Sequence, residues 1–278
     1  MKFCQVNVFS KRTLGNPLGC FLNPKMNTQE LQQLANWMNL SETIFIFPSN
    51  VAHYKLRIFT PTIELPFAGH PLVGSALAAK EFGLISNESH FQVETLAGIL
   101  QLKLVDGQYF VETPIAKEIQ LKTSLNDFKA LLPDHEIRNG LIVDNGPKWL
   151  LIQAIGDDIH NIKFNLGLLK SLLMNNDALG LTLYQVFDKP SDKYESCSVI
   201  SRSLFIDNEI VEDPITGSAN ACIGYHLKKF GLLEKVGNQY FAFQGGCVGR
   251  RGVVSVTVGD RVWVGGDAEI ILTGNYCL

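Results

Sequence analysis

The stretch Glu64–Leu84, ELPFAGHPLVGSALAAKEFGL, decides the fold because the chain contains it twice. Residues Glu212–Leu232, EDPITGSANACIGYHLKKFGL, align with it without a gap, at a constant offset of 148 residues from Glu64 to Glu212. Seven of the 21 aligned positions are identical, whereas average composition would give roughly one or two. A long-range internal repeat of this kind predicts two similar structural units in one chain.

Each copy predicts an extended arm, a glycine turn and a helix that stops. Gly69 and Gly217 mark the turn, and Pro71 suits the first helical position, where its missing N–H costs nothing. Gly83 and Gly231 stand where a left-handed C-cap belongs. The first of the two helices is small and apolar nearly all round, which is typical of a helix buried inside a domain.

Composition excludes several classes of protein. The chain has 278 residues, 46% of them hydrophobic, a net charge of −3 and a pI near 6.1. Because lysine and arginine form no stripe, neither a nucleic acid nor an anionic membrane is expected as a partner. We find no leader and no apolar run long enough to span a membrane. The six cysteines are far apart in the sequence, so free thiols and a cytoplasmic location are expected.

The order of predicted elements in the first half is retraced in the second. Each half predicts mainly antiparallel strands, one outer helix and one inner helix, with Asn27 and Glu30 forming a capping box at the first outer helix. We therefore expect an α/β (α+β) fold with two lobes, residues 1–117 and residues 118–278. The last strand, near residues 270–272, could belong to either lobe.

A diverged repeat is most informative where its two halves differ. Setting LSETIFIF beside LGLTLYQV aligns Thr43 with Thr182 and places Glu42 opposite Leu181. In the repeated stretch, His70 faces Ser218 and Asp213 faces a leucine. The fold does not need these polar side chains, since the other copy does without them. Glu42, His70, Asp213 and Ser218 are therefore candidates for a site in a cleft between the lobes.

A physical account links these candidates. Both glycine turns, at Gly69 and Gly217, begin helices whose free N–H groups and partial positive charge favour a substrate carboxylate. His70 and Ser218 can donate to the same ligand, and Glu42 would carry the proton. Burial and a nearby carboxylate such as Asp213 favour the protonated form of a carboxyl group, which suits acid–base work near neutrality.

Each candidate also has a purely structural explanation. Glu42 could be a solvated carboxylate at a helix end, and His70 a capping or core histidine. Asp213 could simply open a turn, and Ser218 could be an N-cap. The glycine-rich residues 245–252 could bind an anion, although a bulged hairpin is the favoured interpretation. No zinc spacing, nucleophile triad or phosphate loop is found, so neither a metal nor a cofactor is expected.

At these residues the sequence also resembles a known family. The motifs Gly15-Asn16-Pro17, Ser41-Glu42-Thr43, Phe59-Thr60-Pro61, Phe67-Ala68-Gly69-His70-Pro71 and Glu212–Ala219 are similar to those of the PhzF-like phenazine-biosynthesis family. They occur in the family's order and cover the chain from end to end. The resemblance implies the diaminopimelate-epimerase fold, with two pseudo-symmetric domains, each wrapped around a central helix.

The resemblance also implies a function. The family contains cofactor-independent isomerases that move a proton within a small, typically cyclic unsaturated carboxylic acid. Glu42 matches the family's acid/base, and Asp213 and His70 match residues that hold the substrate and tune the proton transfer. Gly69, Gly217 and Ser218, besides His70, match the substrate-binding positions. A homodimer is implied as well.

Two rival functions stay open at this point. Related epimerases use two cysteines, but the matching positions here are Ala68 and Thr216, which disfavours racemisation by two thiols. The other rival is a protein that binds small carboxylates without catalysis. The complete set of candidate residues favours the enzyme, because a binding protein has no need of a proton carrier.

Overall fold

The computed structural model describes residues 1–11, 13–86 and 88–277, and the chain divides into two compact units. The first unit comprises Met1–Thr113 and Trp263–Leu278, and the second comprises Pro114–Val262. The expected boundary after residue 117 therefore lies close to the observed one. The end of the expected second lobe, residues 118–278, differs, because Trp263–Leu278 belong to the first unit, and with them the last strand, which the sequence left open.

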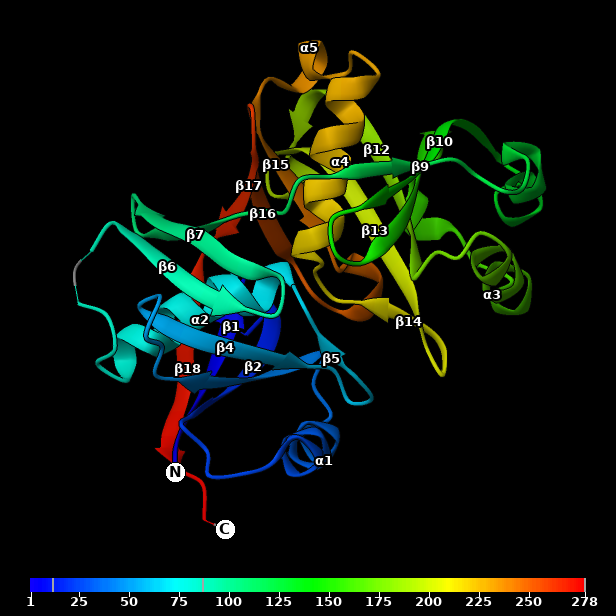
Figure 1. Ribbon diagram of the computed structural model, residues 1–278. Helices are drawn as coiled ribbons and strands as arrows, with labels where there is room; N and C mark the ends of the chain where they lie inside the picture. The colour runs from blue at the N-terminus through cyan, green and yellow to red at the C-terminus, as the bar shows by residue number, and fades with distance from the viewer. Residues whose placement is uncertain (12, 87, 278) are drawn as a thin grey trace. The chain divides into compact units, whose positions relative to one another are not determined.

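The first unit is a curved sheet with one helix inside it (Figure 1). Its strands are β1 (Lys2–Val8), β2 (Asn16–Leu22), β3 (Glu42–Phe47), β4 (Tyr54–Phe59), β5 (Glu64–Leu65), β6 (His90–Thr95), β7 (Gly98–Val105), β8 (Gln108–Glu112), β17 (Val262–Gly266) and β18 (Ala268–Asn275). The pairings run in a circle, because β17 pairs with β8 and then continues, across one residue, into β18, which pairs with β1. The helix α2 (Gly69–Glu81) packs against strands of this circle, including β1, β2, β3 and β8.

The second unit repeats the plan. Its strands are β9 (Lys117–Ile119), β10 (His135–Asp144), β11 (Lys148–Gly156), β12 (Gly180–Ser191), β13 (Cys197–Asp207), β14 (Glu209–Asp213), β15 (Gln239–Gln244) and β16 (Gly252–Val258). The series β10 to β16 pairs in the same order and the same senses as β1 to β7. Both series contain a parallel pair at the second step (β2–β3, β11–β12) and another at β4–β6 or β13–β15. The inner helix is α4 (Gly217–Lys229).

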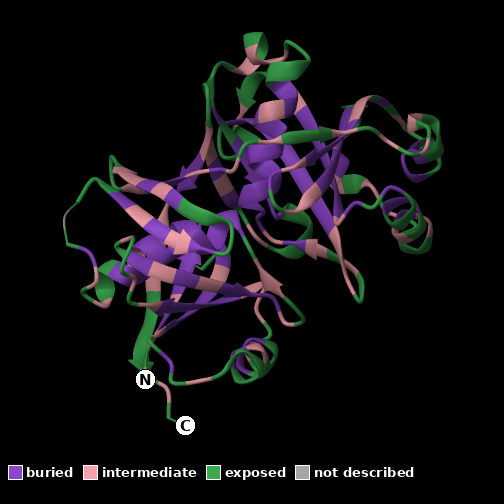
Figure 2. Ribbon diagram, viewed as in Figure 1, coloured by how far each residue is buried: buried purple, intermediate pink, exposed green. Residues whose placement is uncertain are grey.

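The remaining elements cover the outside of each sheet. The helix α1 (Thr28–Met38) packs on β3 and β4 over Phe21, Phe45 and Phe59. In the second unit, α3 (Leu166–Asn175) shares a larger apolar cluster with β11 and β12. Short helices complete the chain at α5 (Leu233–Val236), η1 (Leu125–Leu131), η2 (Ile159–Asn161), η3 (Asp192–Tyr194) and η4 (Gly246–Val248). Figure 2 shows that the sheets and inner helices are mostly buried, whereas α1 and α3 carry exposed residues.

The predicted repeat is confirmed in detail. Both inner helices have 13 residues, and they begin at Gly69 and Gly217. Gly83 and Gly231 follow them with φ of +76° and +68°. The leucine after each glycine donates its N–H to a carbonyl of the last helical turn. Leu84 donates to Ala79, and Leu232 donates to Leu227. This is the glycine C-cap expected from the sequence, and the capping box at Asn27 is confirmed too.

Two local expectations change, and a third is confirmed. Pro71 is the third residue of α2 and not the first, because the helix begins at Gly69. Residues 117–119, which span the expected boundary between the lobes, pair as β9 with β10. The hairpin expected at the glycine-rich residues 245–252 is confirmed, because they join the antiparallel strands β15 and β16, with the short helix η4 in the loop. Arg251 pairs there with Glu195.

Candidate active site

Glu42 and His70 form the chemically most distinctive contact of the first unit. Glu42 is the first residue of β3, and His70 lies in the first turn of α2. The imidazole Nδ1 is 3.2 Å from Oε2 of Glu42, and the exposed fractions of the side chains are 2% for His70 and 13% for Glu42. The structure therefore brings together two residues that lie 28 positions apart in the sequence.

Burial determines the charge of the histidine. It lowers the pKa of His70 from 6.5 to about 3, so the imidazole is neutral near neutral pH. A neutral ring has one N–H donor and one bare nitrogen. If Nδ1 carries the hydrogen it donates to a Glu42 carboxylate, and if Nδ1 is bare it accepts from a Glu42 carboxylic acid. The tautomer of His70 therefore decides which protonation state of Glu42 suits the nitrogen that lies 3.2 Å from it.

Asn16 is a third member of this cluster that the candidate list lacked. It begins β2, it is fully buried, and its amide Nδ2 is 3.4 Å from Nδ1 of His70. The sequence carried a signal for it, because Asn16 lies in the Gly15-Asn16-Pro17 motif. The Nε2 atom on the other side of the ring is buried and has no hydrogen-bond partner among the described residues.

Asp213 ends β14 in the second unit, directly before the turn that leads into α4. Its carboxylate Oδ2 accepts a hydrogen bond of 2.5 Å from the hydroxyl of Thr216. Gln244 braces the same turn, because its side chain bonds the backbone oxygen of Asp213 and both the backbone N–H and the hydroxyl of Thr216. Asp213 is thus held in a defined position at the start of α4.

The two helix starts have no side-chain caps of their own. Ala68, which precedes α2, has no polar side chain, and the hydroxyl of Thr216, which precedes α4, donates to Asp213 instead of capping the helix. Gly69 and Gly217 are the first residues of the two helices. The first-turn N–H groups therefore keep the favourable field for an anion that was expected from the sequence.

Ser218, the counterpart of His70, is held by two residues that the sequence did not single out. The indole Nε1 of Trp149 donates to its hydroxyl oxygen at 3.0 Å, and the side-chain amide of Asn145 donates to its carbonyl oxygen at 2.9 Å. All three residues are buried. Both partners come from the β10–β11 hairpin, about 70 residues earlier in the chain.

The strand pairings correct one alignment. Phe59 pairs with Glu64 and with Thr43, whereas Leu204 pairs with Glu212 and with Leu181. Because Glu64 and Glu212 are equivalent in the repeat, Thr43 corresponds to Leu181 and not to Thr182. Glu42 therefore corresponds to Gly180, one residue earlier than expected from the sequence.

A duplicated ion pair supports this register. Arg57 binds Glu64 through two nitrogens at 2.7 and 2.6 Å, and Arg202 binds Glu212 through two nitrogens at 3.0 and 2.8 Å. Arg57 lies two residues before Phe59, which pairs with Glu64, and Arg202 lies two residues before Leu204, which pairs with Glu212. In the corrected alignment too, the second half has no acid at the position of Glu42, because Gly180 is found there.

The thiols are not placed for nucleophilic or acid–base work. Six free cysteines are present, and four of them are buried. Burial raises the pKa of Cys222, whose thiol donates to the backbone carbonyl of Val143. Cys20 and Cys197 also have raised pKa values, mainly because they are buried. Cys222 is a packing residue of α4.

The predicted site residues thus form two groups. Glu42, His70 and Gly69 lie in the first unit, and Asp213, Gly217 and Ser218 lie in the second. Over residues 1–11, 13–86 and 88–277 no group of three or more His, Cys, Asp or Glu side chains is arranged to hold a metal ion. The same ranges contain no helix with the length and apolar character needed to cross a membrane.

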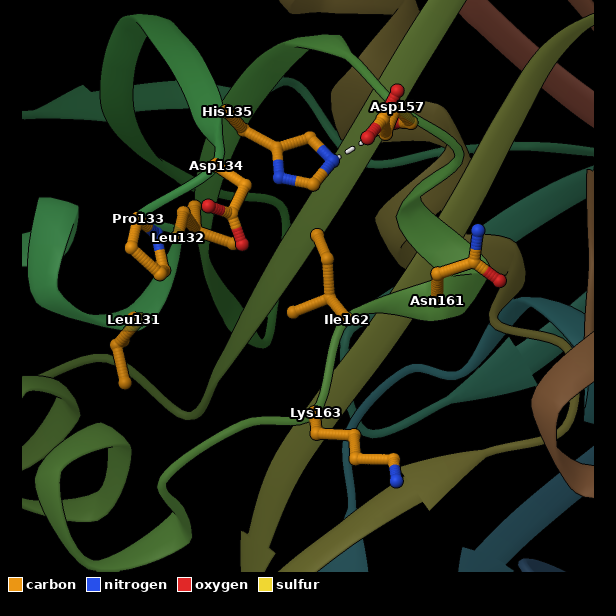
Figure 3. A pocket seen from close by; sticks show the side chains of 9 residues that line it. All are labelled: Leu131, Leu132, Pro133, Asp134, His135, Asp157, Asn161, Ile162 and Lys163. Carbon is orange, nitrogen blue, oxygen red and sulfur yellow. Dashed lines mark hydrogen bonds between the residues drawn. The ribbon is translucent and has the colours of Figure 1, made fainter.

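A separate pocket of about 320 Å³ lies in the second unit (Figure 3). It is lined by Leu131, Leu132, Pro133, Asp134, His135, Asp157, Asn161, Ile162 and Lys163. The ring Nε2 of His135 is 2.8 Å from the backbone carbonyl of Asp157, and this contact ties two sides of the pocket together. None of the residues predicted from the sequence is among those nine.

Comparison with known proteins identifies the class. Solved structures with the epimerase-type fold superpose on nearly the whole of this chain. A PhzF-family protein of Bacillus anthracis has a TM-score of 0.82 at 21% identity and covers 100% of this chain and 99% of its own. A probable proline racemase of Agrobacterium radiobacter has a TM-score of 0.70 at 11% identity, covering 100% and 93%. The diaminopimelate-epimerase-like fold expected from the sequence is confirmed.

The family follows from the sequence comparisons. The model of the phenazine biosynthesis-like proteins (PhzC-PhzF) matches residues 6–274, and the chain belongs to this family. Antisense-enhancing sequence 1 of Schizosaccharomyces pombe is 32% identical over 98% of this chain and 97% of its own length. Trans-2,3-dihydro-3-hydroxyanthranilate isomerase of Pseudomonas chlororaphis is 28% identical over 88% of this chain and 86% of its own. The protein is an enzyme of the isomerase type.

Proposed function

We propose that the protein moves a proton within a small, unsaturated and typically cyclic carboxylic acid, with Glu42 as the single acid/base. The observation that carries the proposal is the contact of 3.2 Å between Glu42 and the buried, neutral ring of His70. Glu42 removes a proton from a carbon beside the unsaturated system and returns it at another carbon. Atoms and electrons balance, since the product is an isomer.

His70 supports one half of this cycle, according to its tautomer. With the hydrogen on Nδ1 the ring would donate to the Glu42 carboxylate, and with a bare Nδ1 it would accept from the carboxylic acid. Asp213, held by Thr216 and Gln244, is proposed to hold polar groups of the same substrate. The N–H groups that begin at Gly69 in the first unit, and those that begin at Gly217 with the hydroxyl of Ser218 in the second, are proposed as binding positions for the substrate carboxylate.

A carboxylate shuttle is preferred to racemisation by two thiols. The positions of the epimerase cysteines are Ala68 and Thr216 in this chain. The buried thiols of Cys20, Cys197 and Cys222 are held protonated by their raised pKa values. A homodimer and a cytoplasmic location stay predictions, the first testable by light scattering and the second by fractionation of cells.

The test is incorporation of solvent deuterium into trans-2,3-dihydro-3-hydroxyanthranilate, the compound named for the Pseudomonas relative. Removing a general acid/base costs typically about 10²- to 10⁴-fold in rate, and we expect a loss of this size for Glu42→Gln. Glu81→Gln is the matched control, since Glu81 is exposed at the end of α2. Undiminished exchange in Glu42→Gln would remove Glu42 from its role. If the test compound stabilises the protein against heat but no deuterium exchange occurs, the non-catalytic binding protein would be favoured instead.

A further inference from the structure

Three neighbouring positions differ together between the two halves of the repeat. In the first unit, Leu18 pairs with Glu42 in a parallel ladder, and Glu42 contacts His70. In the second unit the equivalent positions are Trp149, Gly180 and Ser218, and Trp149 pairs with Gly180 in the same kind of ladder. Trp149 contacts both of the other two residues, so all three positions of the cluster around the acid differ between the halves.

Trp149 occupies the space that an acid side chain would need. A Cβ atom built on Gly180 would lie 2.5 Å from the Cζ3 atom of Trp149 and 2.5 Å from the carbonyl oxygen of Leu204. Directly paired residues of adjacent strands project from the same face of a sheet. The indole therefore lies over Gly180 and extends to the start of α4, where Nε1 reaches Ser218.

This contact restricts where the hydroxyl hydrogen of Ser218 can point. An indole N–H is only a donor, so the oxygen of Ser218 is the acceptor in the bond of 3.0 Å. Its own hydrogen has no acceptor among the described residues, although the side chain is 4% exposed. A buried donor without an acceptor is costly, and a carboxylate placed at the free N–H groups of α4 would remove that cost.

We infer that Trp149 is a positioning residue, which holds the hydroxyl of Ser218 so that its hydrogen is presented to a ligand carboxylate at the start of α4. Asn145 completes the arrangement by fixing the carbonyl oxygen of Ser218 at 2.9 Å. The inference rests on the proposed function in that Ser218 binds the substrate carboxylate. It adds the residue that leaves the hydrogen of this serine to be donated, and it accounts for the absence of an acid at Gly180.

The test compares two probes that differ by a carboxylate, anthranilate and aniline, by titration calorimetry on the full chain. We expect Ser218→Ala to weaken anthranilate binding at least tenfold, since a hydrogen bond to a charged group contributes about 1.5–3 kcal/mol. Trp149→Phe keeps the aromatic packing but removes the N–H, and we expect a weakening of about three- to tenfold. Neither change should alter aniline binding. Trp37→Phe is the matched control, because Trp37 is 73% exposed in the other unit.

The double variant decides whether the indole acts through the serine. In the Ser218→Ala background, Trp149→Phe should change anthranilate binding by less than about twofold, because the hydroxyl that it orients is gone. Effects that multiply in the double variant would overturn the inference, as would equal losses for aniline or no carboxylate preference in the wild type. If Trp149→Phe does not fold, the indole N–H resonance of wild-type Trp149 gives a second measurement. It should shift with anthranilate but not with aniline, and an unmoved resonance would also overturn the inference.

Failure of the proposed function gives a different pattern. If the wild type catalyses no deuterium exchange but the coupling between Trp149 and Ser218 is observed, the proposed isomerisation is contradicted and the positioning role of Trp149 is supported. If deuterium exchange depends on Glu42 but the coupling between Trp149 and Ser218 is absent, only the positioning role is contradicted. Where exchange is measurable, Trp149→Phe should raise KM and leave kcat nearly unchanged, which a general loss of structure would not do.

Discussion

Gly180→Ala tests the idea that the second half of the repeat has no room for an acid. The new Cβ would lie 2.5 Å from the carbonyl oxygen of Leu204, 2.5 Å from Cζ3 of Trp149 and 2.9 Å from Cβ of Phe205. Two of these neighbours cannot yield easily, because one is backbone and the other is a buried ring. Overpacking of this kind costs about 1–3 kcal/mol, and the lower entropy of the unfolded chain returns about 0.4–1 kcal/mol.

We therefore expect Gly180→Ala to lower the free energy of unfolding by about 1–2 kcal/mol. For a unit of about 150 residues this corresponds to a melting temperature lower by about 2–8 °C, measurable by calorimetry or urea denaturation. Gly167→Ala is the matched control, since its Cβ would meet only the side-chain oxygen of Asn165 at 3.6 Å, in helix α3. Helix propensity predicts that this control is neutral or stabilising.

Two results would refute this reasoning. One is a Gly180→Ala variant as stable as the wild type, which would show that the space over Gly180 is not filled. The other is complete rescue by Trp149→Phe. That change relieves the contact with Cζ3 but leaves the carbonyl of Leu204 in place, so we expect the rescue to be partial.

Two further predictions concern charges inside the units. Glu212→Gln should destabilise the protein by roughly 3–5 kcal/mol in urea denaturation, because it leaves the charge of Arg202 buried without its partner. Glu64→Gln should cost less than half as much, since Arg57 is more exposed. Equal losses of stability in the two variants would contradict this ranking. Burial lowers the pKa of His70 from 6.5 to about 3, so between these values the unfolded chain binds a proton that the folded chain does not. The contribution of His70 to the free energy of unfolding is complete above pH 6.5. It falls as the pH drops towards 3, by roughly 2 kcal/mol between about pH 7 and about pH 5. Urea denaturation at several pH values should show a shallower pH dependence of the unfolding free energy for His70→Gln than for the wild type, and an equally steep dependence would contradict the assignment.

Local chemistry explains how much of the fold could be predicted from the sequence. The inner helices were predictable because glycine is needed where φ is positive, as at Gly83 and Gly231. The capping box at Asn27 and the hairpin turn at Asp106 are short-range signals of the same kind. Each of these signals depends on residues within four positions of one another, so no knowledge of the tertiary structure was required.

The equivalence of the β strands was harder, because the loops between them differ in length. The gap from Phe59 to Glu64 is five residues, whereas the gap from Leu204 to Glu212 is eight. A constant offset therefore fails outside the repeated stretch, and the matching threonines led to a register wrong by one residue. Since a shift of one residue turns every side chain to the other face of a strand, Trp149 and its contact with Ser218 could not be found from the sequence.

Asymmetry within a symmetric scaffold is the physical basis of the proposed chemistry. Both halves keep the same strand pairings, the same inner helix and the same arginine–glutamate pair, so these features serve the fold. The acid and the histidine occur in one half only. In the half without the acid an indole fills the space over Gly180 and directs one polar atom to the serine at the helix start. A second carboxyl there would face the glycine-turn anion site and repel the substrate that the site is proposed to bind. One proton carrier and one anion-binding half are therefore expected to depend on each other, and the replacement at Gly180, Trp149 and Ser218 is what a single-carboxylate shuttle requires.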